Sequence, residues 1–171
     1  MYKKTNSRRN FIKKSVVIPS IIILPRHVLG GKNYTSPSDK LDIASVGVGG
    51  RGRRNTIAFQ NENIVSLCDV DSVHSSSTIK KFPKAKFYND FRIMLEKQKN
   101  IDAVIISTPD HTHAVIASMA IKMGKHIFCE KPLTHTVYEA RYIRELAKKY
   151  KVQTQMGNQG HSSNEIRSLK E

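Results

Sequence analysis

The chain has 171 residues, of which 29 are Lys or Arg and 14 are Asp or Glu, so its formal charge is +15. Hydrophobic residues make up 39% and charged residues 25%, which excludes a disordered chain, and two cysteines exclude a disulfide scaffold. No run approaches the ~18–20 apolar residues that span a bilayer. Because seven bases and no acids lie in the first thirty residues, the charge of the remainder does not call for a nucleic-acid partner, and we expect none.

Residues 1–30 have the pattern of a bacterial export signal. Arg8 and Arg9, with a hydrophobic residue two positions later, are typical of a twin-arginine signal. An apolar run follows over residues 15–25, and residues 28–30 form a possible cleavage site. The alternative is a basic arm that binds nucleic acid or a membrane surface, but two prolines interrupt any helix there. We therefore expect a periplasmic protein that uses the twin-arginine export machinery and has no stable membrane anchor.

The two cysteines lie in separate apolar, strand-like runs. Cys68 ends the run over residues 64–68, and Cys129 ends the run over residues 127–129. Buried free thiols are the favoured interpretation, although two cysteines alone leave a disulfide open.

After residue 30 the chain reads as a polar linker over residues 31–40, followed by alternating strands and helices. The expected strands cover residues 41–46, 64–68, 86–88, 103–107, 126–129 and 152–156. The expected helices cover residues 51–60, 73–81, 91–96, 114–123 and 136–150. Because crossovers between parallel strands are right-handed, this order predicts an α/β fold, a doubly wound parallel Rossmann sheet over residues 41–160.

The last residues predict the beginning of another element. Ser162-Ser163-Asn164-Glu165 is a capping box, and its helix is still running at Glu171. We therefore expect residues 161–171 to begin a C-terminal substrate domain that the chain, as a truncated one, lacks.

A glycine-rich turn joins the first expected strand to the first helix. It reads Gly47-Val48-Gly49-Gly50-Arg51-Gly52, the G-x-G-x-x-G pattern. In that pattern the first glycine allows the turn, the second admits a pyrophosphate, and the third allows the helix to pack closely. The N-terminus of the following helix offers free N–H groups to an anion. The candidate cofactor-binding residues here are Gly47, Gly49, Gly50, Arg51 and Gly52.

Asp69 follows the second expected strand, 22 residues after Gly47. A carboxylate at this position accepts hydrogen bonds from the adenosine ribose and repels a 2′-phosphate, so NAD is favoured over NADP as the cofactor. Two alternatives stay open: Arg51, Arg53 and Arg54 suit a 2′-phosphate, and the glycine turn is needed only for packing.

Two other strand ends carry polar clusters, Ser107 to His113 and Glu130-Lys131-Pro132. Ligands bind at the carboxyl ends of parallel strands in open sheets of this kind. A lysine there exchanges protons with a substrate hydroxyl when its neighbours bring its pKa down from about 10.4. His111 and His113 could share a metal ion, but no third ligand has a supporting spacing, and no metal is expected.

Together these motifs resemble the Gfo/Idh/MocA family of oxidoreductases. The resemblance rests on the glycine turn, the Thr-Pro-Asp-x-x-His segment from Thr108, and Cys129-Glu130-Lys131-Pro132; the segment Met156–His161 looks like the exported bacterial branch. It implies an N-terminal Rossmann domain that binds NAD and a C-terminal α/β domain with a large open sheet.

The resemblance also implies roles for particular residues. Lys131 matches the catalytic lysine, and Glu130 matches the residue that contacts the nicotinamide ribose. Asn158 aligns with a cofactor-contacting position. The residues that match the loop beside the nicotinamide are Thr108, Pro109, Asp110, His111 and His113.

The expected function is therefore that of an NAD-dependent oxidoreductase acting on a hydroxyl of a sugar or polyol. Its NAD is expected to be tightly held, Lys131 to be the proton-transfer group, and the full-length protein to be a homo-oligomer. One alternative is an enzyme that cleaves glycosides or epimerises sugars by transient oxidation, although the retained Lys131 favours net redox chemistry. A second alternative is a non-catalytic NAD-binding protein.

Overall fold

The computed structural model describes residues 36, 39–162, 166 and 168. The export signal predicted over residues 1–30 lies outside the described residues, as do most of the linker and residues 163–165 of the second capping box. Contacts divide the chain into residues 1–39 and a folded unit over residues 40–171, which is described below. None of the described helices is long and apolar enough to cross a membrane.

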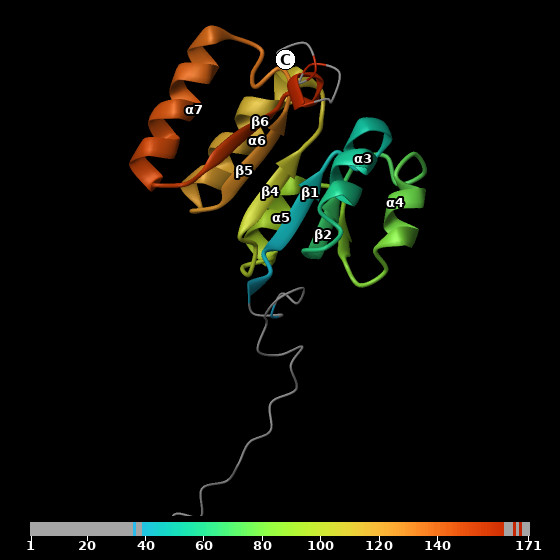
Figure 1. Cartoon of the computed structure of the whole chain (residues 1–171). Coiled ribbons are helices and arrows are strands. Elements are labelled where there is room, and N and C mark those ends of the chain that lie inside the picture. The colour runs from blue at the N-terminus through green and yellow to red at the C-terminus, as the bar shows by residue number, and fades with distance from the viewer. Residues whose placement is uncertain (1–35, 37–38, 163–165, 167, 169–171) are drawn as a thin grey trace, which may run out of the picture. The chain divides into compact units, whose positions relative to one another are not determined.

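Six parallel strands form the centre of the folded unit. They are β1 (Asp42–Val46), β2 (Asn63–Cys68), β3 (Lys86–Tyr88), β4 (Ala103–Ile106), β5 (His126–Glu130) and β6 (Thr154–Gly157). Their order across the sheet is β3-β2-β1-β4-β5-β6, with every neighbouring pair parallel (Figure 1). The chain adds strands outward from β1 to β3 on one side and then from β4 to β6 on the other, so the order switches between β1 and β4, as in dinucleotide-binding folds. The predicted doubly wound parallel sheet is confirmed.

Helices cover both faces of the sheet. They are α3 (Gly50–Ala58), α4 (Ser76–Lys81), α5 (Phe91–Lys97), α6 (Asp110–Lys122) and α7 (Val137–Tyr150), and a short 3-10 helix, η2 (Gln159–Ser162), follows β6. Neighbouring strand residues belong to different cores: Val104 and Ile106 pack with α6, whereas Ile105 packs in the cluster that includes Ile79 of α4. Because both faces are covered, the central strands read as continuous apolar runs.

Helix α6 begins earlier than the sequence indicates. The predicted start is Ala114, but Pro109 occupies the N-cap position and the helix begins at Asp110. The fixed φ of proline and an acidic residue in the first turn both favour this start. Gly124, with φ of +75°, follows the end of the helix, as predicted. The early start places His111 and His113 on a helical turn rather than on a loop, which corrects the predicted boundary.

Two other helices show how local side chains determine helix ends. Helix α4 starts at Ser76, three residues later than predicted, because the carboxylate of Asp71 accepts hydrogen bonds from the N–H groups of Val73 and His74 and holds them in a turn. The predicted capping box of α7 is present: Thr136 Oγ1 accepts from Glu139 N at 3.2 Å, and Glu139 Oε2 accepts from Thr136 N at 2.9 Å.

Cys68 and Cys129 are free and buried, as predicted. Burial raises the pKa of each thiol to about 12, and the nearby carboxylates of Asp69 and Glu130 add to the effect on Cys68 and Cys129 respectively. Because the thiolate is the reactive form, both groups are inert side chains of the core.

The core that supports the sheet ends makes a specific stability prediction. Leu67 is 0% exposed in β2, whereas Leu41, just before β1, is 46% exposed. Leu67→Ala should lower the free energy of unfolding by about 2–5 kcal/mol, because it leaves a cavity in the core. Leu41→Ala, the same change at an exposed position, should alter it by less than about 0.5 kcal/mol. Denaturant titration of both variants measures this, and equal losses would contradict the assigned core.

Candidate functional site

The glycine turn brings α3 unusually close to the ends of β1 and β4. Gly47 has φ of +78°, and a Cβ built on it would lie 2.8 Å from the backbone of Ser107 and Thr108. A Cβ on Gly52 would collide with the carbonyl of Gly47 and lie 3.0 Å from Ser107 Cβ. The first and third glycines of the motif thus have the structural roles that the pattern predicts.

The second glycine faces a side chain that the sequence does not single out. A Cβ on Gly49 would lie 2.6 Å from His74 Nε2, so the imidazole packs directly against the turn. His74 comes from the segment before α4, a polar stretch with no recognisable motif. His74 comes close to Gly49 only in the folded chain, when β1 and β2 pair.

Asp69 stabilises the glycine turn from the end of β2. Its Oδ2 accepts hydrogen bonds from Val48 N at 2.8 Å and Gly49 N at 3.1 Å, and its Oδ1 accepts from Asp71 N at 3.0 Å. A carboxylate has about four acceptor positions, so these bonds leave room for one hydroxyl donor. The half-buried carboxylate is therefore placed both to stabilise the turn and to bind a ribose.

A cavity of about 650 Å³ opens at the carboxyl ends of β1, β2 and β4. We refer to it as the larger cavity. The predicted site residues that line it are Gly47, Gly49, Gly50, Arg51, Asp69, Thr108 and Pro109. His74, Asn89 and Phe91 also line it and are not predicted from the sequence. Its volume is typical of cavities that bind small molecules and cofactors.

A smaller cavity of about 510 Å³ adjoins it at the end of β5. Its lining residues are Arg51, Ser107, Thr108, Glu130, Lys131, Gln159 and Gly160. Arg51, Ser107 and Thr108 line both cavities, so the two form one elongated site along the strand ends. The structure thus brings the glycine turn, Asp69, Glu130 and Lys131 together.

Glu130 is the most completely paired side chain of the smaller cavity. Its Oε2 accepts hydrogen bonds from Asn55 Nδ2 and from Gln159 Nε2, each at 2.8 Å, and Arg51 Nε lies 3.5 Å from Oε1. Burial by itself raises the pKa of Glu130, but these hydrogen bonds and the Arg51 charge outweigh it and hold the pKa below its ordinary value. Glu130 is therefore a carboxylate at neutral pH, ready to accept from a bound hydroxyl.

Two residues that donate hydrogen bonds to Glu130 carry no recognisable signal of this role in the sequence. Asn55, buried in α3, donates both to Glu130 and to Ser107 Oγ at 2.8 Å. Gln159 reaches Glu130 because Gly157 has no side chain; a Cβ there would lie 2.8 Å from Gln159 Nε2. An Asn inside a helix has no motif signal, whereas Gln159 is adjacent to Asn158 in a segment that the sequence does single out.

Lys131 is exposed and lines the smaller cavity directly after Glu130. The peptide bond that joins it to Pro132 is cis. Lys131 therefore stands at the end of β5, directly after the carboxylate of Glu130 and in the lining of the same cavity.

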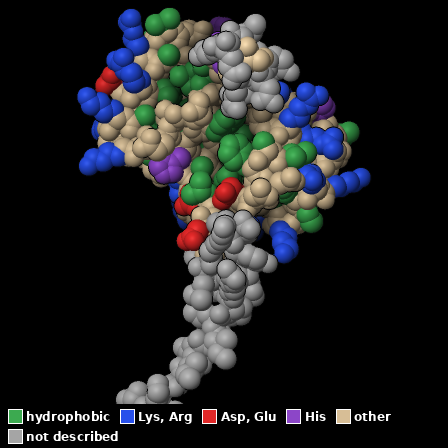
Figure 2. Space-filling model, in the orientation of Figure 1, with side chains coloured by type: hydrophobic (Ala, Val, Ile, Leu, Met, Phe, Trp, Pro, Cys, Tyr) green, Lys and Arg blue, Asp and Glu red, His purple; other side chains and the backbone are tan. Residues whose placement is uncertain are grey.

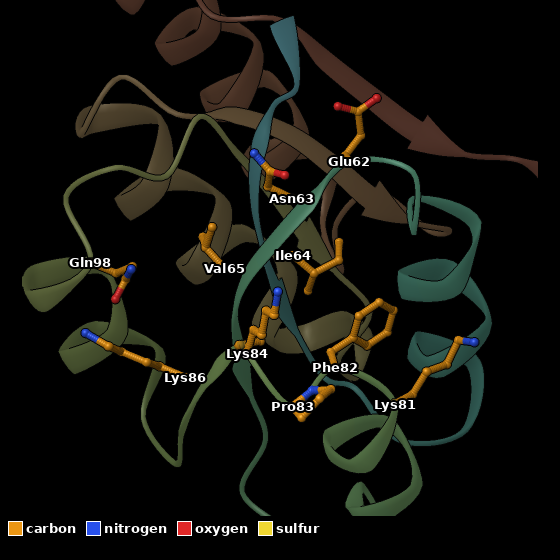
Figure 3. Close-up of a pocket in the computed structure, with 11 residues that line it drawn as sticks. Glu62, Asn63, Ile64, Val65, Lys81, Phe82, Pro83, Lys84, Lys86 and Gln98 are labelled. Carbon is orange, nitrogen blue, oxygen red and sulfur yellow. The ribbon is translucent and has the colours of Figure 1, made fainter. Parts of the chain in front are cut away.

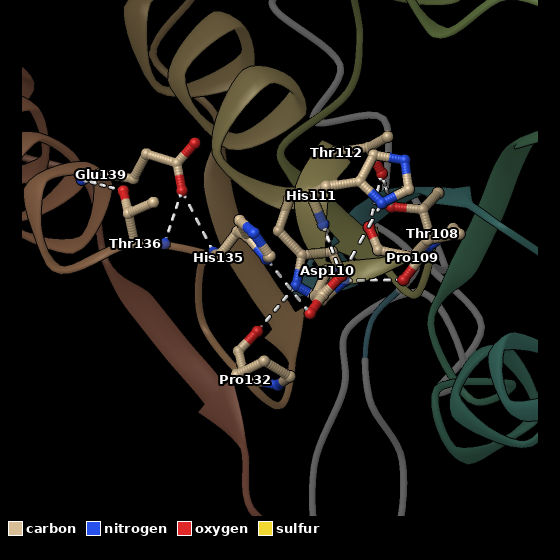
Figure 4. A network of polar contacts seen from close by, with 10 residues as sticks. Thr108, Pro109, Asp110, His111, Thr112, Pro132, His135, Thr136 and Glu139 are labelled. Atoms are coloured by element: carbon tan, nitrogen blue, oxygen red, sulfur yellow. Dashed lines mark hydrogen bonds and ion pairs between the residues drawn. The ribbon is translucent and has the colours of Figure 1, made fainter.

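The first turn of α6 carries a cluster of polar side chains (Figure 4). Asp110 accepts from the N–H of His111 at 2.8 Å, and its carboxylate lies 3.7 Å from His111 Nδ1 and 3.6 Å from His135 Nδ1. The hydrogen bond from the His111 backbone and the nearby imidazoles keep the pKa of Asp110 below its ordinary value. Asp110 and His111 are predicted site residues, yet they line neither cavity.

Two other predicted site residues have supporting or peripheral positions. His113 is buried, with its ring between the carbonyl oxygens of Thr108 and Pro132 at 2.8 Å each. Asn158 is exposed between β6 and η2, where its N–H donates to Met156 O. For both residues, and for Asp110 and His111, direct contact with a cofactor stays a prediction.

A third cavity, of about 520 Å³, lies at the start of β2 and beside the segment that follows α4 (Figure 3). Ile64, Phe82 and Pro83 give it an apolar lining, and several lysines project around it. It lies at the amino end of the strands, whereas ligands of doubly wound sheets bind at the carboxyl ends. We assign the functional site to the two adjoining cavities.

On the face of the molecule drawn in Figure 2, basic side chains lie mainly over the helices. In Figure 2, Lys and Arg stand at the margins of the folded unit, over α7 on one side and over α3 and α4 on the other. Arg51 is the basic residue shared by the two adjoining cavities. It therefore supplies the positive charge at the junction between them.

Comparison with known proteins agrees with this geometry. The family model described as "Oxidoreductase family, NAD-binding Rossmann fold" matches residues 41–158. Inositol 2-dehydrogenase of Salmonella paratyphi B is 29% identical over 113 residues, which are 64% of this chain and 33% of that protein. Glucose-6-phosphate 3-dehydrogenase of Bacillus subtilis is 26% identical over 118 residues, which are 67% of this chain and 33% of that protein.

A solved structure has a similar fold. Myo-inositol 2-dehydrogenase of Lactobacillus plantarum superposes with a TM-score of 0.70 at 26% identity, over 77% of this chain and 40% of that one. The chain spans about a third of the length of the curated relatives it matches. The family expected from the glycine turn and the Glu-Lys-Pro segment is confirmed. The chain belongs to the Gfo/Idh/MocA oxidoreductase family and contains its NAD-binding Rossmann domain.

Proposed function

We propose that this chain is the NAD-binding part of an oxidoreductase that acts on a hydroxyl-bearing carbon of a sugar or polyol. The observation that carries the proposal is the elongated site, in which the glycine turn and Asp69 occupy one end and Glu130 and Lys131 the other. The named relatives, an inositol 2-dehydrogenase and a glucose-6-phosphate 3-dehydrogenase, support the substrate class. The remaining substrate contacts belong to the part of the enzyme that the relatives have beyond this domain.

The residues present fit a dinucleotide. Gly47 and Gly52 leave no side chain between the turn and β4, and Asp69 has one acceptor position free for the adenosine ribose. Glu130 is a carboxylate at the far end, held to accept from the second ribose. When bound, NAD supplies the hydride acceptor. Because the groups at the two ends of the site differ, they favour one orientation of the bound dinucleotide, with its adenosine toward Asp69.

Lys131 is the proton-transfer group of the proposed reaction. Oxidation of a carbinol to a carbonyl releases one hydride and one proton, and NAD, when bound, would take the hydride. Lys131 Nζ would accept the hydroxyl proton in this direction and return a proton to the oxygen in the reverse direction. Its place directly after Glu130 brings the amine to the same cavity as the proposed nicotinamide ribose contact.

The position of Asp69 predicts a preference for NAD over NADP. A 2′-phosphate would meet a carboxylate that already accepts from three N–H groups and that forms no ion pair with a cation among the described residues. Calorimetric titration with both cofactors should show tighter binding of NAD. Asp69→Ala should narrow the preference, because it removes both the ribose acceptor and the repulsion. Equal or stronger binding of NADP to the unmodified protein would refute the assignment.

Lys131 makes a second prediction, for the full-length enzyme. Lys131→Met should leave NAD affinity nearly unchanged and lower kcat by about 10²-fold or more, the usual scale for a lost proton-transfer group. Lys84→Met, at an exposed lysine beside the third cavity, is the matched control and should leave kcat unchanged. Near-normal turnover in Lys131→Met, with NAD shown to be bound, would remove the lysine from the mechanism.

We further propose that the full-length protein is exported through the twin-arginine pathway, as a folded homo-oligomer with NAD already bound. The support is the sequence of residues 1–30, together with the need to fold before a dinucleotide can bind. A compartment with little free NAD requires that the hydride be returned to the same sugar or to a second carbonyl. Transient oxidation during epimerisation or glycoside cleavage is a variant of the same closed cycle.

The export proposal has a direct test. The full-length protein, purified from the periplasm without added cofactor and then denatured, should release close to one NAD or NADH per chain. Replacing Arg8 and Arg9 by lysine should retain the protein in the cytoplasm, because the paired arginines are the recognition element. An empty periplasmic protein that needs millimolar NAD and accumulates free NADH would indicate an ordinary dissociable dehydrogenase instead.

A further inference from the structure

His113 occupies an unusual position between two segments of the site. It lies in the first turn of α6, is 1% exposed, and lines neither cavity. Its Nδ1 is 2.8 Å from the carbonyl oxygen of Pro132, and its Nε2 is 2.8 Å from the carbonyl oxygen of Thr108. One imidazole thus joins the segment after β4 to the segment after β5.

The two carbonyl partners of the ring can both be satisfied only by ring N–H groups. A backbone carbonyl oxygen only accepts hydrogen bonds, and a neutral imidazole carries one N–H, so a neutral ring can donate to only one of the two carbonyls. The other nitrogen would then direct a lone pair at an oxygen 2.8 Å away. A ring with a proton on each nitrogen donates to both carbonyls, and both contacts become hydrogen bonds.

The groups around His113 have opposing effects on a ring with a proton on each nitrogen. A cation near a helix N-terminus, buried from water, is unfavourable. Two charge-assisted hydrogen bonds replace hydration, and Asp110 in the first turn of the same helix carries a charge of the opposite sign. The other titratable groups of the two segments are His111 on α6 and Lys131 and His135 on the loop after β5, of which His111 and His135 lie within 4 Å of Asp110.

The two carbonyls belong to residues that shape the site. Thr108 lines both cavities, and Pro132 directly follows Lys131, which lines the smaller one. We propose that His113 is a positioning residue whose doubly protonated ring holds the carbonyls of Thr108 and Pro132 and thereby sets the separation of the two sides of the smaller cavity. The identity of the ligand in that cavity, the nicotinamide half of NAD, rests on the proposed function.

The protonation can be observed without any ligand. In the chain labelled with 15N at histidine, two-bond proton–nitrogen correlation spectra at neutral pH distinguish a ring with two N–H groups from either neutral tautomer. His113→Gln assigns the signal by its disappearance. We expect both ring nitrogens of His113 to be protonated. A spectrum with one unprotonated nitrogen would overturn the proposal.

The positioning role is tested by comparing two ligands. ADP fills only the adenosine end of the site, whereas NAD also needs the smaller cavity. His113→Leu should weaken NAD binding by about tenfold, or 1.4 kcal/mol, and change ADP binding by less than about twofold. His113→Gln should restore part of the NAD affinity, because its amide has two N–H groups for the same carbonyls. His135→Gln, at an exposed ring on the same loop, is the matched control and should bind both ligands normally.

The outcomes separate this proposal from the one on which it rests. If the unmodified chain binds neither NAD nor ADP, the proposed function fails, whereas the spectra still decide the protonation of the ring. If the unmodified chain binds both ligands and His113→Leu lowers both affinities equally, or neither, the positioning role is overturned. Should His113→Leu fail to fold by circular dichroism, the ratio of NAD to ADP affinity in His113→Gln carries the test alone.

Discussion

The structure depends on the close approach of α3 to the ends of β1 and β4. Gly52 lies against the carbonyl of Gly47, at a separation that any side chain would prevent. Because the helix begins so close to the sheet, a polar side chain one turn further along can reach the neighbouring strand ends. Asn55 does so, and its amide donates to Ser107 after β4 and to Glu130 at the end of β5. The glycine turn therefore organises the far end of the site as well as its own.

The carboxylates of the site are each compensated by protein donors. Asp69 accepts from three backbone N–H groups, and Glu130 accepts from two side-chain amides beside Arg51. Donors that are fixed by packing cost no reorganisation when a ligand binds. The chain can thus keep two acidic groups at opposite ends of one elongated site without either charge being left unpaired.

The sequence predicts the parts of this site that depend on local patterns. Strand periodicity, the glycine turn, Asp69 and the Glu-Lys-Pro segment all arise from neighbours in the chain, and the structure places them at one edge of the sheet. The role of Asn55 escapes prediction because its partner Glu130 is 75 residues away. An asparagine within a helical sequence does not indicate such a long-range contact. The contacts of His113 with backbone carbonyls escape prediction because the helix start at Asp110 is missed, and the first helical turn directs its ring to the backbone.

The hydrogen bonds of Asp69 also restrict where an anion can bind. The N–H groups of Val48 and Gly49 already donate to the Asp69 carboxylate, and the N–H of Arg53 donates to Gly49 O within the helix. The first N–H groups of α3 have no partner inside the helix, so Gly50 and Arg51 are the accessible donors of the turn, Gly52 being buried. Gly50 lines the larger cavity and Arg51 lines both. A pyrophosphate held by these two N–H groups would therefore lie at the junction of the cavities, with one nucleoside directed toward Asp69 and the other toward Glu130 and Lys131.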